Sequence, residues 1–357
     1  MTKWAVQVPV TVVTAPGFPR VVATANALVA GDKGLLAIDE SIPTCNKRFA
    51  RLGIAQTEHN RRAYRELIVT TPSLGDSISG VILCDETIRQ RTTHGDTFAA
   101  VLVNAGIVPG IKVDLGAKPL AAHLSEKVTE GLDGLRERLA QYVALGARFA
   151  KWRAVFTIGE TLPSRSCVQA NAHALARYAA LCQEADLVPI VEPEVLMAGE
   201  HSLARCGEVT EDVLREVFSQ LHAQGVLLEA MLLKTNMVLP GLTWPLQETA
   251  EAVADATICC LRRVVPAAVA GIAFLSGGQS GDLATARLNA VNAAGRQPLP
   301  WPVAFSYGRA IQQPALTLWD GRHANVGRAQ HAIARRAKAN RDARRGEYAH
   351  TAVLAPT

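Results

Sequence analysis

Short apolar runs recur along most of this 357-residue chain, each bounded by turn-forming or polar residues. Continuous apolar character, without strict alternation, is typical of parallel strands that are buried on both faces. The pattern predicts eight strands, at 35–38, 80–83, 110–113, 148–150, 188–191, 227–233, 271–275 and 302–305.

Segments with helical periodicity lie between these runs. One predicted helix covers 135–143 and ends at Gly146, and a second begins with Thr210 as N-cap and ends at Gly225. A third covers 247–264. Strand–helix units that repeat about every 30 to 45 residues predict a closed (β/α)8 barrel, a TIM barrel of the α/β class. An open doubly wound sheet is the alternative, although no G-x-G-x-x-G follows the first strand.

No linker or change of composition divides the chain between residues 20 and 340. We therefore expect one barrel domain over 1–345 with an N-terminal extension at 1–21, followed by a flexible C-terminal tail at 346–357. The composition, 49% hydrophobic and 19% charged, is that of an ordinary globular protein. No apolar run reaches the roughly 18 residues that cross a bilayer, so no membrane association is expected.

The net charge and the cysteines limit the partners and the cellular compartment that we expect. A net charge of +5 suits phosphorylated metabolites as well as nucleic acid. The basic cluster at 335–345 has helical spacing and no interleaved aromatic residues, and we interpret it as a solvated helix face without a nucleic-acid partner. Seven cysteines without a CxxC pair indicate reduced thiols and a cytoplasmic protein.

Charged side chains occur near the ends of six of the eight expected strands, and glycine-containing turns follow the last two. A charge in a buried strand is costly unless it is paired or faces a wet pocket. In a closed barrel the C-terminal strand ends meet at one mouth, where enzymes with this fold place their active sites. The residues expected there are Asp39, Lys112, Lys151, Arg153, Glu192, Glu194, Lys234, Ser276, Gly277, Gly278, Ser306, Gly308 and Arg309.

This set predicts two kinds of chemistry. The turns at 276–280 and 308–309 each precede a helical segment, so their backbone N–H groups can bind a phosphate. Lys234 ends the apolar run 231–233, and a lysine amine freed of its proton by desolvation and a neighbouring cation, such as Lys151, attacks a carbonyl to form an imine. The alternative is a purely structural role, in which Lys234 forms an ion pair with Glu192 or Glu194.

A metal site is not expected. The nine histidines include no HxH or HExxH spacing, and none lies at a strand end. No cofactor is predicted either.

Seven ordered motifs resemble those of class I fructose-1,6-bisphosphate aldolases, over about Val22 to Tyr348. They are GLLAIDES at 34–41, GIKVD at 110–114, FAKWR at 149–153, VEPE at 191–194, LLKTNMV at 232–238, FLSGGQS at 274–280 and FSYGR at 305–309. The loop at 41–48 is closer to bacterial and plant forms than to animal ones.

The resemblance implies a metal-independent retro-aldol cleavage of fructose 1,6-bisphosphate. Lys234 matches the lysine that attacks C2, and Glu192 matches the general acid/base that dehydrates the carbinolamine. Asp39 matches the carboxylate that helps to remove the C4 hydroxyl proton. Lys151 matches the lysine that contacts the substrate hydroxyls and favours the unprotonated nucleophile, and Glu194 is similar to the residue that completes this charge network.

The resemblance also implies a substrate-binding set. The C1-phosphate would bind at Ser276, Gly277, Gly278, Gly308 and Arg309, beside Ser306. The C6-phosphate would bind at Ser41, Thr44 and Lys112, with Arg48 and Arg153 shaping that end. The expected partners are small-molecule sugar phosphates, and the family resemblance implies a homo-oligomer, a tetramer.

The tail departs from the family pattern. Animal members end in a tyrosine that assists proton exchange at C3, whereas the last tyrosine here is Tyr348. We hypothesise that another group or water protonates C3. Two other functions remain open at this point: a Schiff-base barrel of the transaldolase kind, and a noncatalytic sugar-phosphate sensor.

Overall fold

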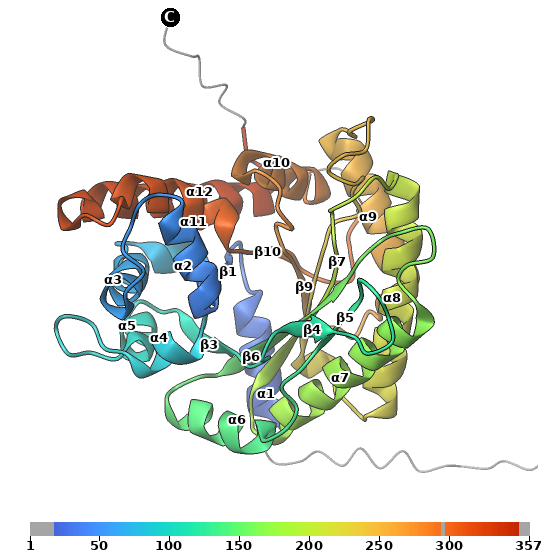
Figure 1. Ribbon diagram of the computed structural model, residues 1–357, viewed down its shortest axis with the longest axis horizontal. Helices are drawn as coiled ribbons and strands as arrows, with labels where there is room; N and C mark the ends of the chain where they lie inside the picture. The colour runs from blue at the N-terminus through green and yellow to red at the C-terminus, as the bar shows by residue number, and fades with distance from the viewer. Residues whose placement is uncertain (1–17, 294–296, 350–357) are drawn as a thin grey trace, which may run out of the picture.

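Eight parallel strands close into a barrel in the computed structural model, which describes residues 18–293 and 297–349 (Figure 1). Around the barrel the strand order follows the chain order, with β1 paired to both β2 and β10. The predicted (β/α)8 fold is therefore confirmed. The barrel strands are β1 Gly34–Ala37, β2 Ile78–Leu83, β3 Val108–Lys112, β6 Phe149–Phe156, β7 Val188–Val195, β8 Leu232–Thr235, β9 Gly271–Phe274 and β10 Val303–Tyr307.

Helices surround the barrel (Figure 1). They are α1 Phe18–Leu28, α2 Ile42–Ala50, α3 Glu58–Val69, α4 Asp85–Arg89, α5 Phe98–Asn104, α6 Leu135–Ala144, α7 Arg165–Glu184, α8 Leu203–Ala223, α9 Ala250–Val264, α10 Gly281–Val291, α11 Arg309–Trp319 and α12 Val326–Arg344. Three short 3-10 helices (η1 Leu74–Asp76, η2 Leu228–Ala230, η3 His323–Asn325) and a small antiparallel sheet (β4 Ala117–Pro119, β5 Lys127–Thr129) complete the elements. Among the described residues, no helix is both long and apolar enough to cross a membrane.

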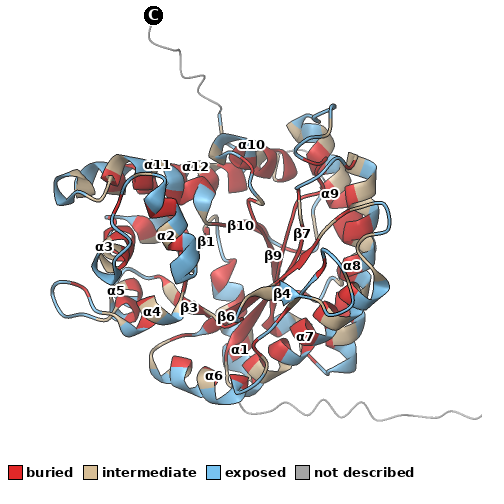
Figure 2. Ribbon diagram, in the orientation of Figure 1, coloured by how far each residue is buried: buried red, intermediate tan, exposed pale blue. Residues whose placement is uncertain are grey.

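The apolar core has two parts, and the buried faces of the helices other than α1 in Figure 2 belong to the larger one, between strands and helices. The smaller part fills the barrel interior and continues onto α1, whose buried residues are Val21, Ala25 and Leu28. Phe149 lies in this interior, and a Cβ on Gly110 would lie 2.2 Å from its ring. Glycine is therefore required where β3 passes the Phe149 side chain.

Side chains alternate between the two faces of a strand, and this alternation decides which side chains point into the mouth of the barrel. Phe149, Ile190 and Leu232 fill the barrel interior. The residues two positions further along each of these strands point to the same interior, one layer nearer the C-terminal end. These residues are Lys151, Glu192 and Lys234. The charged side chains therefore lie directly above this apolar layer, at the C-terminal end of the barrel.

Several local predictions were wrong. The run at 227–233 is strand only from Leu232, because η2 occupies 228–230. Helix α8 begins at Leu203, where the Ser202 hydroxyl accepts a hydrogen bond from the Arg205 N–H (3.2 Å). Thr210 therefore lies inside the helix, buried, and its hydroxyl accepts a hydrogen bond from Asn236 Nδ2 (3.2 Å).

The basic cluster on α12 is not simply a solvated face. Arg336 and Arg344 are buried, whereas Arg335, Lys338 and Arg345 are exposed. Arg336 pairs with Asp282 of α10 (2.5 Å), and Arg344 donates hydrogen bonds to two backbone carbonyls near the start of β1. The cluster thus docks α12 on the barrel.

The ends of the chain are described only in part. Residues 18–21 of the expected N-terminal extension form the first turn of α1, and residues 1–17 lie outside the described residues. Most of the predicted flexible tail, residues 350–357, also lies outside them.

Candidate active site

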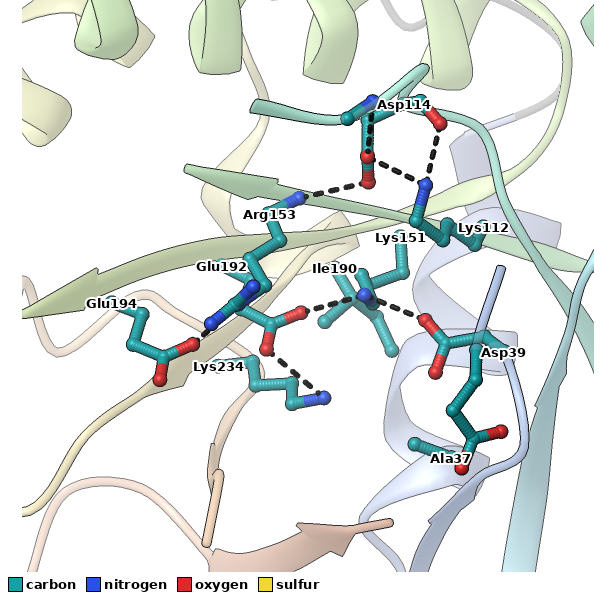
Figure 3. A network of polar contacts seen from close by, with 12 residues as sticks. Ala37, Asp39, Lys112, Asp114, Lys151, Arg153, Ile190, Glu192, Glu194 and Lys234 are labelled. Atoms are coloured by element: carbon teal, nitrogen blue, oxygen red, sulfur yellow. Dashed lines mark hydrogen bonds and ion pairs between the residues drawn. The ribbon is translucent and has the colours of Figure 1, made fainter. Parts of the chain in front are cut away.

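A chain of ion pairs crosses the mouth of the barrel (Figure 3). Lys151 Nζ lies 2.6 Å from Asp39 Oδ2 and 3.1 Å from Glu192 Oε2, and Lys234 Nζ lies 3.2 Å from Glu192 Oε1. The lysine and glutamate side chains are at most 5% exposed. The structure thus brings together four predicted residues from β6, β7, β8 and the end of β1, and Glu192 bridges both lysines.

Mutual attraction keeps Asp39, Glu192 and Lys151 charged despite their burial. Burial alone would raise the pKa of Asp39, but Lys151 and Lys234 lower it to about 2. The pKa of Glu192 is likewise lowered, since the lysines outweigh the effect of burial. Burial acts to lower the pKa of Lys151, yet Asp39 and Glu192 raise it above its usual value. Lys151 is therefore a permanent cation next to Lys234.

Two further ion pairs flank this chain on the side of β3 and β6. Lys112 Nζ lies 2.6 Å from Asp114 Oδ1, and Arg153 Nε lies 2.5 Å from Glu194 Oε2. The Arg153 backbone N–H also donates to Asp114 Oδ2 (3.3 Å) (Figure 3). Glu194 thus contacts Arg153, and the ion pair of Lys234 is with Glu192 alone of the two glutamates.

The loop after β1 carries hydroxyl groups and an anchored arginine. Ser41 Oγ and Thr44 Oγ1 are 3.0 Å apart, and both residues are exposed. Arg48, in contrast, is buried: its guanidinium pairs with Glu40 and donates to Gln312 Oε1 (3.1 Å). Arg48 therefore holds the loop against α11.

The turns after β9 and β10 each lead directly into a helix N-terminus, where backbone N–H groups can bind an anion. Gly277 and Gly278 have φ values of +55° and +101°, and a Cβ on Gly277 would lie 2.9 Å from Met197 Sδ. Only glycine fits both this left-handed backbone and the close approach. Ser280 caps α10 by accepting from the Leu283 N–H (3.2 Å), and Gly308 is the N-cap of α11. Two helix N-termini therefore begin directly after these turns.

All sixteen predicted site residues line one cavity of about 2190 Å³ at the C-terminal end of the barrel. The cavity is large enough for a sugar with two charged groups. Lys47, Arg51, Arg335 and Tyr348 also line it. No group of three or more His, Cys, Asp or Glu residues in the described part of the chain is placed to hold a metal ion.

Comparison with known proteins decides the family. The family model for class I fructose-bisphosphate aldolase, a glycolytic enzyme, matches residues 20–355. The chain belongs to the class I fructose-bisphosphate aldolase family. A probable fructose-bisphosphate aldolase class 1 of Xanthomonas campestris is 56% identical over 326 residues, covering 91% of this chain and 97% of that protein.

More distant relatives of this aldolase family agree. The cytosolic fructose-bisphosphate aldolase 5 of Arabidopsis thaliana is 49% identical, covering 92% of this chain and 91% of that protein. A crystal structure of the Plasmodium falciparum aldolase, in complex with TRAP and a small-molecule inhibitor, superposes with a TM-score of 0.92 at 45% identity. It covers 94% of this chain and 96% of that one.

Sequence reasoning missed some residues of this aldolase site. Asp114 lies inside one of the family motifs and accepts from Lys112 and Arg153, so the motif itself was a usable signal. Glu40, which binds both Arg48 and Arg65, follows Asp39 directly. Gln312, on α11, could not be found from spacing, because it reaches Arg48 across 264 residues of chain.

Proposed function

We propose that this protein catalyses the reversible cleavage of fructose 1,6-bisphosphate to dihydroxyacetone phosphate and glyceraldehyde 3-phosphate through an imine on Lys234. The observation that carries the proposal is the buried amine of Lys234, 3.2 Å from a carboxylate that also binds Lys151. A buried amine beside a proton carrier and a second cation is the arrangement that imine formation with a ketose requires.

Imine formation moves protons between neighbouring groups. Lys234 passes a proton from Nζ to the Glu192 carboxylate, 3.2 Å away, and the free amine attacks the C2 carbonyl to form a carbinolamine. Glu192, in its protonated form, donates a proton to the C2 hydroxyl, which leaves as water, and the nitrogen lone pair forms the C=N bond. The resulting iminium is a cation, and the adjacent Glu192 carboxylate stabilises it.

Cleavage then uses the iminium as an electron sink. Asp39 removes the C4 hydroxyl proton, the C3–C4 bond breaks, and its electron pair forms an enamine with C2 while glyceraldehyde 3-phosphate leaves. The depressed pKa of Asp39 keeps it ionised as the acceptor, and Lys151 stabilises the negative charge that develops on O4. Protonation at C3 and hydrolysis of the imine release dihydroxyacetone phosphate and restore Lys234.

The two ends of the cavity support a bisphosphate substrate. The turns with Ser276, Gly277, Gly278, Gly308 and Arg309, beside Ser306, would bind the C1-phosphate at two helix N-termini. The C6-phosphate would bind at the other end, at Ser41, Thr44 and Lys112, with Arg48 and Arg153 positioning that wall. A barrel that acts on monophosphates needs only one such end.

The pathway, cellular compartment and oligomeric state are proposed by analogy with the aldolase family. We place the enzyme in glycolysis or gluconeogenesis in the cytoplasm, by analogy with the cytosolic relatives. A homotetramer and sugar phosphates as the only partners are expected on the same ground.

The test is to trap the imine. The purified protein is incubated with fructose 1,6-bisphosphate in EDTA, reduced with borohydride, and digested for mass spectrometry. We expect a triose-phosphate adduct on Lys234, with cleavage unaffected by EDTA. Lys234→Arg should abolish both adduct and turnover, while Lys338→Arg, an exposed lysine on α12, should change neither. No adduct and no cleavage by the unaltered protein would contradict the proposal.

A further inference from the structure

A buried arginine without a carboxylate partner lies behind the 276–280 turn. Arg287, in the second turn of α10, is 3% exposed, and its Nη1 donates to Gln279 Oε1 (2.9 Å). Its Nε has no hydrogen-bond partner in the structure, and no ion pair joins it to any described residue. Burying a guanidinium is unfavourable unless a negative charge compensates it.

Among the described residues, the surroundings of Arg287 supply no such charge. Tyr307 of β10 is the titratable group that interacts with it electrostatically, and burial raises the pKa of Tyr307, which keeps the phenol neutral. The nearby Arg336 differs in this respect, because Asp282 neutralises it at 2.5 Å. Arg287 therefore carries a charge that residues 18–293 and 297–349 leave uncompensated.

Gln279 connects this charge to the cavity. It lines the cavity, its backbone N–H donates to the Ser276 carbonyl (2.9 Å), and its side-chain oxygen accepts from Arg287. Gln279 Nε2 is buried and has no hydrogen-bond partner in the described part of the chain. A donor without a partner, polarised by a cation behind it, is suited to face an anion in the turn.

We propose that Arg287 is a positioning residue that acts through Gln279 to set the affinity of the 276–280 turn for a phosphate group, and that the bound phosphate balances the charge of Arg287. The inference rests on the function proposed above, since it takes this turn as the site of the substrate's C1-phosphate. Arg287 itself is not among the cavity-lining residues, so its effect is electrostatic and passes through one hydrogen bond.

The experiment compares a ketone with and without a phosphate. Half-saturating concentrations for borohydride-trapped imine are measured with dihydroxyacetone phosphate and with dihydroxyacetone. We expect Arg287→Met to raise the value for dihydroxyacetone phosphate about tenfold, the size of one well-placed charge interaction, and to leave that for dihydroxyacetone within about twofold. Arg287→Lys, which keeps the charge, should stay near the unaltered protein. The rise in Tm caused by inorganic phosphate should be smaller in Arg287→Met.

A matched control removes a similar buried arginine at the other end of the barrel. Arg344 is 8% exposed and contacts backbone carbonyls near the start of β1, so Arg344→Met should leave both half-saturating concentrations unchanged. Equal changes for the two ketones in Arg287→Met, or no change for either, would overturn the proposal. If Arg287→Met does not fold, Arg287→Gln provides the neutral variant.

Failure of the proposed function gives a different result. The unaltered protein would then trap neither ketone, and calorimetric titration with inorganic phosphate would take over as the readout. A Kd about tenfold weaker in Arg287→Met than in the unaltered protein and Arg287→Lys would still support the role of Arg287, and equal Kd values would refute it.

Discussion

Glu192→Gln is the substitution that most directly tests the central ion pairs. Glu192 is the carboxylate that both buried lysines share, with Nζ–O distances of 3.1 Å to Lys151 and 3.2 Å to Lys234. Glutamine keeps the shape and one acceptor oxygen but removes the negative charge and the ability to carry a proton. Lys151 then retains Asp39, whereas Lys234 loses the carboxylate it contacts.

The structure sets the size of both effects. Each pair, at about 3 Å and an effective dielectric constant near 20, has a Coulomb energy of about 5 kcal/mol, most of which desolvation offsets. Removing one partner of a buried pair costs about 3 to 5 kcal/mol, and the glutamine oxygen should keep the loss of unfolding free energy at the lower end. Loss of the general acid/base should lower kcat by about 10² to 10⁴, which corresponds to about 3 to 5 kcal/mol in the barrier.

Two measurements separate chemistry from stability. The rate of borohydride-trapped imine formation with dihydroxyacetone phosphate should fall with kcat, because carbinolamine dehydration needs the proton. Glu126→Gln is the control: Glu126 is also buried and accepts from the Ser164 N–H (2.7 Å), but it lies outside the cavity lining. It should lose stability without losing kcat. A Glu192→Gln variant that is folded and cleaves within tenfold of the unaltered protein would refute the assigned role.

Three further predictions follow from other features of the site. The pKa of Asp39 is lowered from 3.8 to about 2, which contributes about 2 kcal/mol to the free energy of unfolding above pH 4 and is lost as the pH falls toward 2. The difference in unfolding free energy in urea between the unaltered protein and Asp39→Asn should therefore shrink between pH 6 and pH 3. A difference that stays constant would argue against this prediction. Gly277 has φ +55°, and the Cβ of Gly277→Ala would lie 2.9 Å from Met197 Sδ, so this variant should lower the free energy of unfolding by about 1 to 3 kcal/mol. It should also weaken the binding of dihydroxyacetone phosphate at least tenfold more than that of dihydroxyacetone, as measured by imine trapping. Deleting residues 349–357 should leave kcat for fructose 1,6-bisphosphate within about threefold, because another group or water is expected to protonate C3; a loss of a hundredfold would instead assign that step to the tail.

The barrel could be predicted because its signal is local. Buried parallel strands are apolar runs of strand length, and each barrel strand includes part of a run visible in the sequence. The failures share one cause, which is that tertiary contacts decide them. An apolar segment can form either strand or turn, as at 228–230, and Ser202 and Thr210 are equally good caps until packing selects one. Likewise, Arg336 is buried because Asp282 approaches from a different helix.

The residues that line the cavity could be listed from the sequence, but not their partners. Residues at strand ends converge in any closed barrel, so their common location needed no contact information. Glu192 and Glu194 are two residues apart on β7 and share a face, so register decides which of them lies beside Lys234. Ile190 lies beside Leu232, and two residues further along, on the same interior face, Glu192 lies beside Lys234. Arg287 gave no signal at all, because an arginine in an amphipathic helix is ordinarily solvated.

In this charge arrangement, the groups that transfer protons are not the groups that attract the substrate. Asp39 and Glu192 balance Lys151 and Lys234, and the pairs of Lys112 with Asp114 and of Arg153 with Glu194 add no net charge. A balanced centre can pass protons among its members without a large change in its field, but it does not attract a polyanion. That attraction has to come from cations outside the balanced pairs, at the cavity rim and behind the phosphate turn, such as Lys47, Arg51, Arg287, Arg309 and Arg335. Substrate affinity and proton transfer can therefore vary independently in this barrel, and variation in affinity should occur mainly between the family motifs, where all of these cations except Arg309 lie.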